Sequence, residues 1–204
     1  MIRSFTLVSH EDIGWFLDNV SEDVLVIIDE ATIDFVKGPD YKNAASYAIS
    51  RPNVVVSRTF SKVYGLPGVR MGYAFGDPQN FEDSWLYSGW TMMMPTLSVY
   101  AATAALKDTE HVRRSKEAIR AGREYLAQQL KEMVIPFTPS ETNFLVLDMG
   151  KDPGDIISYL RKKRVLVRNA HDRWDIKNHF RVSIGTQDEL EVFVSTLKEA
   201  LVNV

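Results

Sequence analysis

Residues 57–72 read SRTFSKVYGLPGVRMG, a run that combines hydroxyls, one lysine, two arginines and three glycines. The run begins inside a predicted strand, residues 53–59, where three consecutive valines favour β structure. A second strand is predicted at 69–75, after a loop rich in glycine and proline. In open α/β sheets, ligands bind where the carboxyl ends of the strands lie. The sequence therefore predicts a binding site in the loop after residue 59.

The side chains of this loop favour an anionic ligand. Hydroxyls and backbone N–H groups at such a turn can hold a phosphate, and Arg70 would add a planar, bidentate donor. The spacing of a P-loop, Gly-x4-Gly-Lys, is absent. Taken alone, Lys62 would be an ordinary solvated surface lysine, so its significance depends on the whole run.

A second informative segment precedes this one. The continuous apolar run at 24–28 predicts a short strand that is buried on both faces, as in a parallel sheet, and it ends in Asp29. Taken alone, Asp29 would be a strand-end acid that caps a loop. Ser9, followed by two acids, predicts the start of a helix before this strand. Strands separated by connecting segments indicate an α/β layer architecture.

The second half of the chain predicts a different organisation. Apolar residues recur at steps of three and four over 112–133, which predicts a long helix whose charged face, Arg123 included, is solvated. Strands are then predicted at 144–147, 165–167 and 180–184, with a helix opening at Pro153 and a capping box starting a last helix. We expect a partial large domain at 1–108, and a bridging helix with a small α+β domain at 109–204.

Composition excludes several classes of function. The 204 residues carry 24 basic and 27 acidic side chains, so the formal charge of −3 gives no reason to expect nucleic acid or an anionic membrane as a partner. The absence of cysteine excludes disulfides and thiolate metal sites, and the four histidines lack metal-ligand spacing. No apolar run approaches the roughly 20 residues of a membrane span. We expect a cytoplasmic chain without a metal.

The run at 57–72 resembles the lysine-bearing motif of fold-type I pyridoxal-phosphate enzymes, and is most similar to that of the histidinol-phosphate aminotransferase family. The family pattern is approximately R-T-[FL]-S-K-x-[FY]-G-L-x-G-x-R-x-G-[YF], and residues 58–73 match nearly every fixed position. Residues 26–35, VIIDEATIDF, look like the family's D-E-A-Y-x-x-F segment. Residues 142–144, 165–168 and 180–186 resemble its N-F motif and its two carboxyl-terminal arginine motifs, in family order.

The resemblance implies the carboxyl-terminal part of a pyridoxal-phosphate-dependent transferase, with a partial large domain and the small domain. Lys62 would form a Schiff base with pyridoxal 5'-phosphate and then move a proton between the substrate and the cofactor. Asp29 would pair with the protonated pyridine nitrogen. The remaining cofactor contacts would come from the phosphate-binding side chains and the residue at the family's tyrosine position, namely Thr59, Ser61, Arg70 and Thr32.

The resemblance also implies how substrates bind. Arg181 would hold the substrate carboxylate, a role that suits the planar guanidinium. Arg168 is a candidate for a distal substrate phosphate, with an exposed strand-end arginine as the equal alternative. Asn143 either contacts the same carboxylate or caps its turn. The reaction implied is transamination between an amino acid or amino-alcohol phosphate and 2-oxoglutarate, in a homodimer serving amino-acid biosynthesis.

The chain departs from the family in two respects. Thr32 stands where the family has a tyrosine, and its hydroxyl is several ångströms short of a tyrosine's reach, so weaker catalysis is expected. The chain also matches only the carboxyl-terminal part of the family, so we expect a fragment, an engineered half or the product of a truncated gene. Two alternatives follow: a non-catalytic folding or dimerisation module that pairs with a missing amino-terminal half, or a decarboxylase or lyase using the same cofactor.

Overall fold

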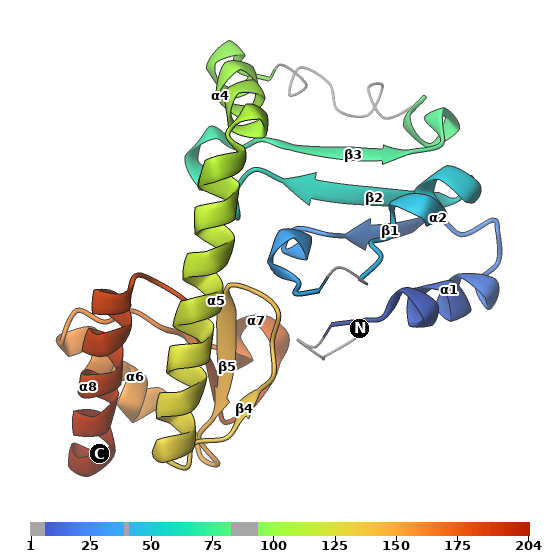
Figure 1. Cartoon of the computed structure of the whole chain (residues 1–204). Coiled ribbons are helices and arrows are strands. Elements are labelled where there is room, and N and C mark those ends of the chain that lie inside the picture. The colour runs from blue at the N-terminus through green and yellow to red at the C-terminus, as the bar shows by residue number, and fades with distance from the viewer. Residues whose placement is uncertain (1–6, 39–40, 83–93) are drawn as a thin grey trace. The chain divides into compact units, whose positions relative to one another are not determined.

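The computed structural model describes residues 7–38, 41–82 and 94–204 (Figure 1). The chain divides into two compact units, Val8–Ser115 and, in the main, Lys116–Val204. The long helix α5 (Thr109–Glu132) is continuous across that division. Among the described helices, none is both long enough and apolar enough to cross a membrane.

The first unit is built on a three-stranded sheet. Its strands β1 (Val26–Asp29), β2 (Val54–Thr59) and β3 (Gly72–Gly76) lie in that order, with β1 parallel and β3 antiparallel to β2 (Figure 1). The predicted strand at 53–59 is confirmed. The next strand begins three residues later than predicted, because Pro67–Val69 form the short 3-10 helix η2.

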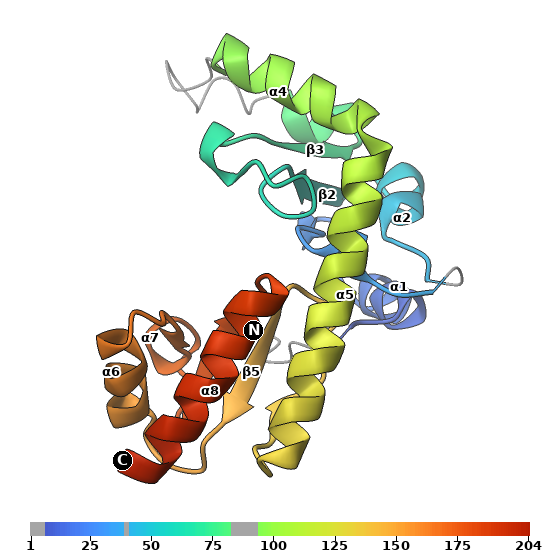
Figure 2. The same ribbon diagram turned by 60° about the vertical axis from the view of Figure 1, so that its left-hand side comes forward.

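Two helices cover one face of this sheet (Figure 2). Helix α1 (His10–Asp18) begins where predicted, since the Ser9 hydroxyl accepts the backbone N–H of Asp12 at 3.0 Å. Helix α2 (Ala45–Ser50) follows η1 (Ile33–Phe35). Their apolar side chains enclose a small core with alternate residues of β1 and β2: Leu17, Ala44, Ala48, Val54 and Val56 are buried there, with Val26 and Ile28 packed against them.

The prediction that β1 is buried on both faces was wrong. Ile27 is 64% exposed and Leu25 is 51% exposed, while the intervening residues pack on the helices. Within the described residues, β1 pairs only with β2. It is therefore an edge strand with one bare face, although its composition is that of an interior strand.

The rest of the first unit packs against the turn that follows the carboxyl end of β2. After η3 (Pro78–Phe81), helix α4 (Thr96–Lys107) packs Ala102 against Phe60 and Met71. The Ser98 hydroxyl also donates to the carbonyl of Val69 at 2.7 Å. The apolar run 90–95, WTMMMP, predicts a place in the core or at a subunit interface. Only its last two residues lie within the described part of the chain.

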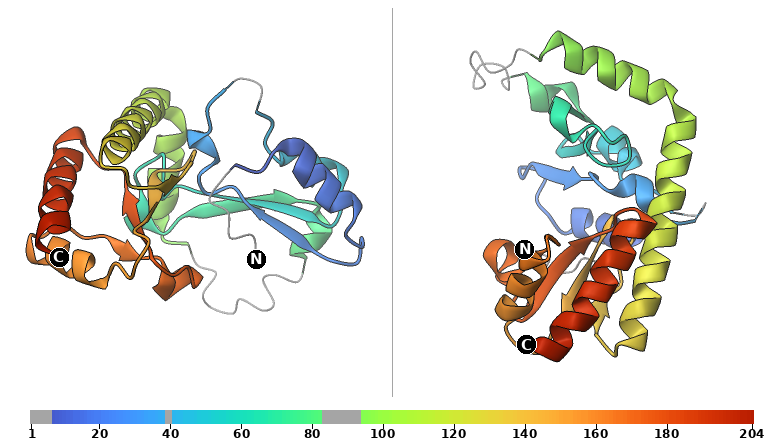
Figure 3. Two further views of the ribbon diagram at one scale, coloured as in Figure 1. Left: turned by 90° about the horizontal axis from the view of Figure 1, so that it is seen from below. Right: turned by 90° about the vertical axis from the view of Figure 1, so that its left-hand side faces the viewer.

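The second unit contains an antiparallel sheet of four strands in the order β4-β5-β7-β6 (Figure 3). The strands are β4 (Phe137–Thr138), β5 (Phe144–Asp148), β6 (Arg168–Asn169) and β7 (His179–Ser183). The strand predicted at 165–167 is displaced. Those residues form a connection whose valines pack on the core, and pairing begins only at β6.

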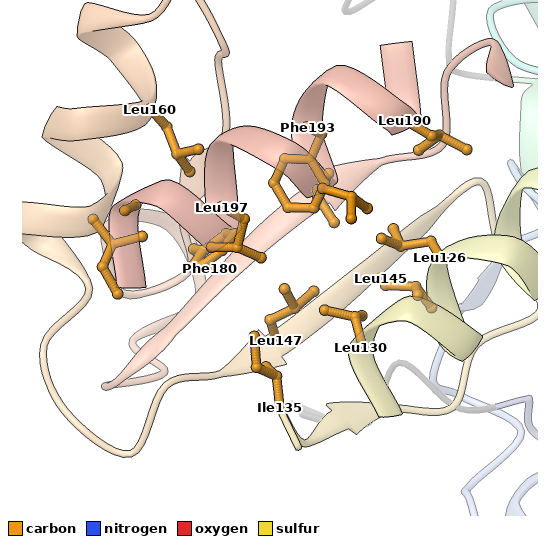
Figure 4. Close-up of a cluster of buried hydrophobic side chains, with 14 of the residues drawn as sticks. Leu126, Leu130, Ile135, Leu145, Leu147, Leu160, Phe180, Leu190, Phe193 and Leu197 are labelled. Atoms are coloured by element: carbon orange, nitrogen blue, oxygen red, sulfur yellow. The ribbon is translucent and has the colours of Figure 1, made fainter. Parts of the chain in front are cut away.

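Three helices cover one face of that sheet and enclose the main core (Figure 4). They are the carboxyl-terminal half of α5, α6 (Gly154–Lys162) and α8 (Gln187–Asn203). The short helix α7 (His171–Trp174) joins β6 to β7. The capping box predicted for the last helix is confirmed: Thr186 and Glu189 exchange side-chain-to-backbone hydrogen bonds. Fully buried leucines and Phe180 fill the space between: Leu126, Leu130, Leu145, Leu147, Leu160, Leu190 and Leu197.

This core gives a first testable prediction, using two leucines one turn apart on α8. Leu197 is fully buried, whereas Leu201 is 41% exposed. Because a cavity replaces a buried side chain, Leu197→Ala should lower the free energy of unfolding by about 2–5 kcal/mol. Leu201→Ala should lower it by about 1 kcal/mol or less. Urea unfolding followed by circular dichroism measures both, and equal losses would contradict this assignment of the core.

Candidate active site

The carboxyl ends of β1 and β2 bring the two predicted motifs to one edge of the sheet. The strands run parallel, and their register places Asp29 beside Ser57. Lys62 follows the end of β2 by three residues. The predicted acid and the lysine-bearing loop therefore follow neighbouring strands on the same side of the first unit, as ligand sites in open α/β sheets require.

Asp29 is exposed at this edge and retains most of its capacity to accept hydrogen bonds. Its Oδ1 accepts the backbone N–H of Ala31 at 2.9 Å, which is the local strand-end contact expected of an aspartate. A carboxylate has about four lone-pair positions, so a further donor can be bound. Thr32 starts η1 without using its side chain as a cap, and its hydroxyl is half-buried.

A hydroxyl turn follows β2. Thr59 Oγ1 accepts the backbone N–H of Ser61 at 3.1 Å and donates to Ser61 Oγ at 3.0 Å. The two hydroxyls are thereby held side by side, and the O–H of Ser61 is left to donate to another group. This is the donor arrangement that a phosphate can use.

The loop around Lys62 is fixed by its backbone. Gly65 N–H donates to the carbonyl of Lys62 at 2.9 Å, and Leu66 N–H donates to the carbonyl of Phe60 at 3.0 Å. Gly65 has a φ of +67°, which glycine adopts without strain, and it faces the imidazole of His111 on α5. The lysine side chain is half-buried, and no hydrogen bond or ion pair within the described residues engages its Nζ.

Arg70 lies in the same loop, but its present contact is local. Its guanidinium is exposed and donates to the carbonyl of Pro67 at 3.0 Å. Its backbone adopts φ +51° and ψ +48°, a left-handed conformation that is unusual for a residue with a side chain. Such strain persists only where the surrounding structure imposes it.

The most buried charge at this edge was missed by the sequence analysis. Glu30 is 6% exposed, and its Oε2 accepts Nε and Nη2 of Arg58 at 2.9 and 2.8 Å. Its Oε1 accepts the backbone N–H of Ala44, at the start of α2, at 2.6 Å. Burial alone would lower the pKa of Arg58, but hydrogen bonds to Glu30 and Tyr73 outweigh it and raise that pKa. In the structure, continuing the register that pairs Asp29 with Ser57 places Glu30 beside Arg58. Once two strands are taken to be parallel neighbours, such a pair of opposite charges is the signal that could have revealed this contact.

A second testable prediction concerns this pair. Glu30→Ala leaves a partly buried guanidinium without its counter-charge, so it should lower the free energy of unfolding of the first unit by about 3–5 kcal/mol. The control is the exposed pair between Asp18 and Arg51, where Asp18→Ala should cost about 1 kcal/mol or less. Equal effects of the two substitutions in urea unfolding would show that the Glu30 pair has no special structural role.

The second unit contains the three predicted substrate-binding residues and pairs two of them. In the register of β6 and β7, Arg168 lies directly opposite Arg181, so both arginines occupy the same face of the sheet. Asn143 precedes β5, and its carbonyl accepts the backbone N–H of Ile184 at 2.9 Å. Its Oδ1 is buried and has no hydrogen-bond donor among the described residues.

Two contacts of Arg123 fix the turn that precedes β5. The sequence analysis placed Arg123 on the solvated face of α5, and this was wrong: it is 8% exposed. It donates to the carbonyl of Thr142 at 2.9 Å and to Glu141 at 2.8 Å, which fixes the turn before Asn143. Periodicity alone cannot distinguish a solvated arginine from one that reaches a neighbouring loop.

Arg181 is flanked by aromatic rings. Its guanidinium carbon lies 4.2 Å from the centroid of the Phe144 ring and 5.9 Å from that of Trp174. The two rings are themselves stacked, with centroids 6.3 Å apart and planes inclined by 17°. Its Nη2 also lies 3.4 Å from the hydroxyl of Ser183, a long hydrogen bond. Trp174 had no role in the sequence analysis.

Comparison with known proteins agrees with this arrangement. Residues 6–197 match the family model described as aminotransferase class I and II. The chain belongs to this family. It is 36% identical over 198 residues to the histidinol-phosphate aminotransferase of Moorella thermoacetica, an alignment that covers 96% of this chain and 50% of that protein.

Solved structures extend the likeness to the fold. The histidinol-phosphate aminotransferase of Sinorhizobium meliloti, solved in complex with pyridoxal-5'-phosphate, superposes with a TM-score of 0.85 at 26% identity, over 99% of this chain and 55% of that one. The L-threonine-O-3-phosphate decarboxylase of Porphyromonas gingivalis gives a TM-score of 0.81 at 20% identity, over 98% of this chain and 62% of that one. The second likeness concerns the fold alone.

These comparisons confirm the predicted family and α/β fold class. They also show that the chain spans about half the length of the curated relatives it matches. Because this fold carries both an aminotransferase and a decarboxylase, the fold does not determine the reaction. The reaction, the substrates and the roles of individual residues therefore stay proposals.

Proposed function

We propose that this chain provides the lysine-bearing and arginine-bearing part of a pyridoxal-phosphate-dependent aminotransferase. Its amino donor is an amino acid or an amino-alcohol phosphate of the histidinol-phosphate type, and its acceptor is 2-oxoglutarate. The observation that carries the proposal is the parallel pairing of β1 with β2, which sets Asp29 beside the start of the Lys62 loop in a chain of this family.

The residues at the sheet edge have the chemistry that pyridoxal 5'-phosphate needs. Asp29 is exposed, and its carboxylate can accept a hydrogen bond from the protonated pyridine nitrogen. The side chain of Lys62 is half-buried, and no described side chain forms a hydrogen bond or an ion pair with its amine. The Ser61 hydroxyl, held in place by Thr59, can donate to the phosphate, as can the exposed guanidinium of Arg70. The residues present therefore fit the cofactor.

When bound, the cofactor supplies an electron sink that stabilises negative charge at the substrate Cα. Lys62 holds it covalently through Nζ and later moves the proton at that carbon. Asp29 keeps the pyridine nitrogen protonated through its negative charge. In this proposal Thr32, which precedes η1, takes the place of the family's tyrosine. Its hydroxyl reaches less far than the hydroxyl of a tyrosine would.

The arginine face of the second unit suits an anionic substrate. Like charges placed directly opposite in a sheet repel each other, so an anion bound by Arg168 and Arg181 would relieve that repulsion. In our proposal Arg181 forks onto a carboxylate and Arg168 binds the phosphate of a phosphorylated donor. In our proposal Asn143, whose buried Oδ1 has no hydrogen-bond donor among the described residues, either contacts the same carboxylate or caps its turn.

The attachment of the cofactor gives the third testable prediction. After incubation with pyridoxal phosphate and reduction with borohydride, mass spectrometry should find one reduced cofactor on the peptide that contains Lys62. Lys62→Ala should abolish this labelling, because it removes the amine that would form the Schiff base. Lys42→Ala, which removes an exposed lysine of the same unit, is the matched control and should leave the labelling intact.

The fourth prediction separates the two arginines by substrate. Arg168→Met should lower kcat/KM for an amino-alcohol phosphate by about tenfold or more, since a charge-assisted hydrogen bond is lost. It should change kcat/KM for an unphosphorylated amino acid by less than about threefold. Arg161→Met, at an exposed arginine on α6, serves as control. A parallel loss for both donors would remove the phosphate role of Arg168.

The bare edge of β1 favours a second candidate function. A strand edge with exposed apolar residues invites pairing, so the chain would serve as a folding or dimerisation module that associates with a second copy or with an amino-terminal half. Size-exclusion chromatography distinguishes the two: a defined dimer that takes up no cofactor supports the module and counts against the enzyme. Product analysis with several amino acids would separate transamination from decarboxylation or β-elimination.

A further inference from the structure

Glu30 extends the strand that carries Asp29 by one residue. Its backbone N–H donates to the carbonyl of Ser57 at 2.9 Å, so the pairing of β1 with β2 continues past the end of β1. Successive side chains of a strand point to opposite faces of the sheet. The burial alternates accordingly, since Asp29 is exposed and Glu30 is only 6% exposed. Asp29 therefore lies on the bare face of the sheet, and Glu30 lies on the face that α1 and α2 cover.

The bare face gives Asp29 little support. Within the described residues its carboxylate has one contact, the local hydrogen bond from the N–H of Ala31. Its neighbours on this face are Ile27, which is 64% exposed, and the small side chain of Ser57 on β2. Among the described strands, β1 pairs only with β2. The end of such an edge strand opens readily unless a further contact holds it.

The covered face supplies that contact through Glu30. Its Oε1 accepts the backbone N–H of Ala44 at 2.6 Å, and its Oε2 accepts Nε and Nη2 of Arg58 at 2.9 and 2.8 Å. Arg58 is itself held, because its guanidinium carbon lies 5.3 Å from the ring centroid of Phe75 on β3. The carboxylate of Glu30 is thus fixed from α2 and from β2 at once. In an extended backbone, fixing this side chain also sets the direction in which the adjacent Asp29 leaves the strand.

We infer that Glu30 is a positioning residue, which fixes the end of β1 so that the Asp29 carboxylate has one direction in which to meet a pyridine nitrogen. The inference rests on the proposed function, because it takes Asp29 to be the partner of that nitrogen. It adds a specific requirement to the structural role of the buried pair. Lys62 and the hydroxyl turn follow β2, which is paired on both sides, so their contacts to the cofactor should not depend on Glu30.

Equilibrium dialysis of the full chain against two cofactors tests this inference. One is pyridoxal 5'-phosphate, and the other is 1-deazapyridoxal 5'-phosphate, in which a C–H group replaces the pyridine nitrogen. Glu30→Gln, which keeps the size of the side chain, should weaken binding of pyridoxal phosphate by about three- to tenfold, as expected for the partial loss of a charge-assisted hydrogen bond. It should change binding of the deaza compound by less than about twofold, because that compound has no ring nitrogen to donate to Asp29.

Two further variants calibrate the measurement. Asp29→Ala sets the preference for pyridoxal phosphate over the deaza compound that remains without the carboxylate. Asp18→Ala removes the carboxylate of an exposed ion pair in the same unit, and it is the matched control. It should leave the binding of both cofactors unchanged.

The outcomes are distinguishable. If Asp29→Ala loses the preference for pyridoxal phosphate while Glu30→Gln retains it, the positioning role is overturned and the role of Asp29 stands. If Glu30→Gln weakens binding of both cofactors equally, its effect is on the fold as a whole, and the inference is again overturned. If Asp29→Ala retains the preference, or if the wild type binds neither cofactor, the role proposed for Asp29 falls and the inference falls with it.

Discussion

The candidate site of the first unit depends on the buried ion pair between Glu30 and Arg58. These two side chains link the carboxyl ends of β1 and β2 to the start of α2 through four hydrogen-bonding groups. Each partner is adjacent in sequence to a candidate residue: Asp29 precedes one and the hydroxyl turn follows the other. Burying an ion pair costs desolvation energy and adds little net stability, so what it contributes here is a defined register between the two motifs.

The second unit shows two ways of accommodating a buried or crowded arginine. Arg123 is paired with a carboxylate and a carbonyl, so its donors are occupied and it acts as a structural support for the turn before Asn143. Arg181 lies near two aromatic rings, with its guanidinium carbon 4.2 Å from the centroid of Phe144 and 5.9 Å from that of Trp174. The two arginines of this unit therefore differ in their surroundings: a carboxylate and a carbonyl for Arg123, and aromatic rings for Arg181.

Local signals in the sequence were sufficient for much of the fold. The Ser9 cap, the valine-rich strand, the long amphipathic helix and the Thr186 capping box were predicted because each depends on residues within about one turn of each other. The errors at β1, β6 and Arg123 share a different cause. Burial of Ile27, the start of strand pairing at Arg168 and the partner of Arg123 depend on residues distant in sequence, which periodicity does not reveal. Trp174 was missed for the same reason.

The exposed face of β1 has a physical meaning beyond the failed prediction. Natural edge strands are usually protected by charge, proline or a bulge, and the run at 24–28 has none of these. Its composition instead fits a strand with a neighbour on both sides. Pairing with another strand would satisfy the free edge of β1 next to Asp29. Burial of Ile27 requires a layer packed on the bare face of the sheet, because strand side chains point out of the plane of the sheet. In our proposal, the free edge of β1 is therefore the place where a further strand would complete the first unit beside Asp29.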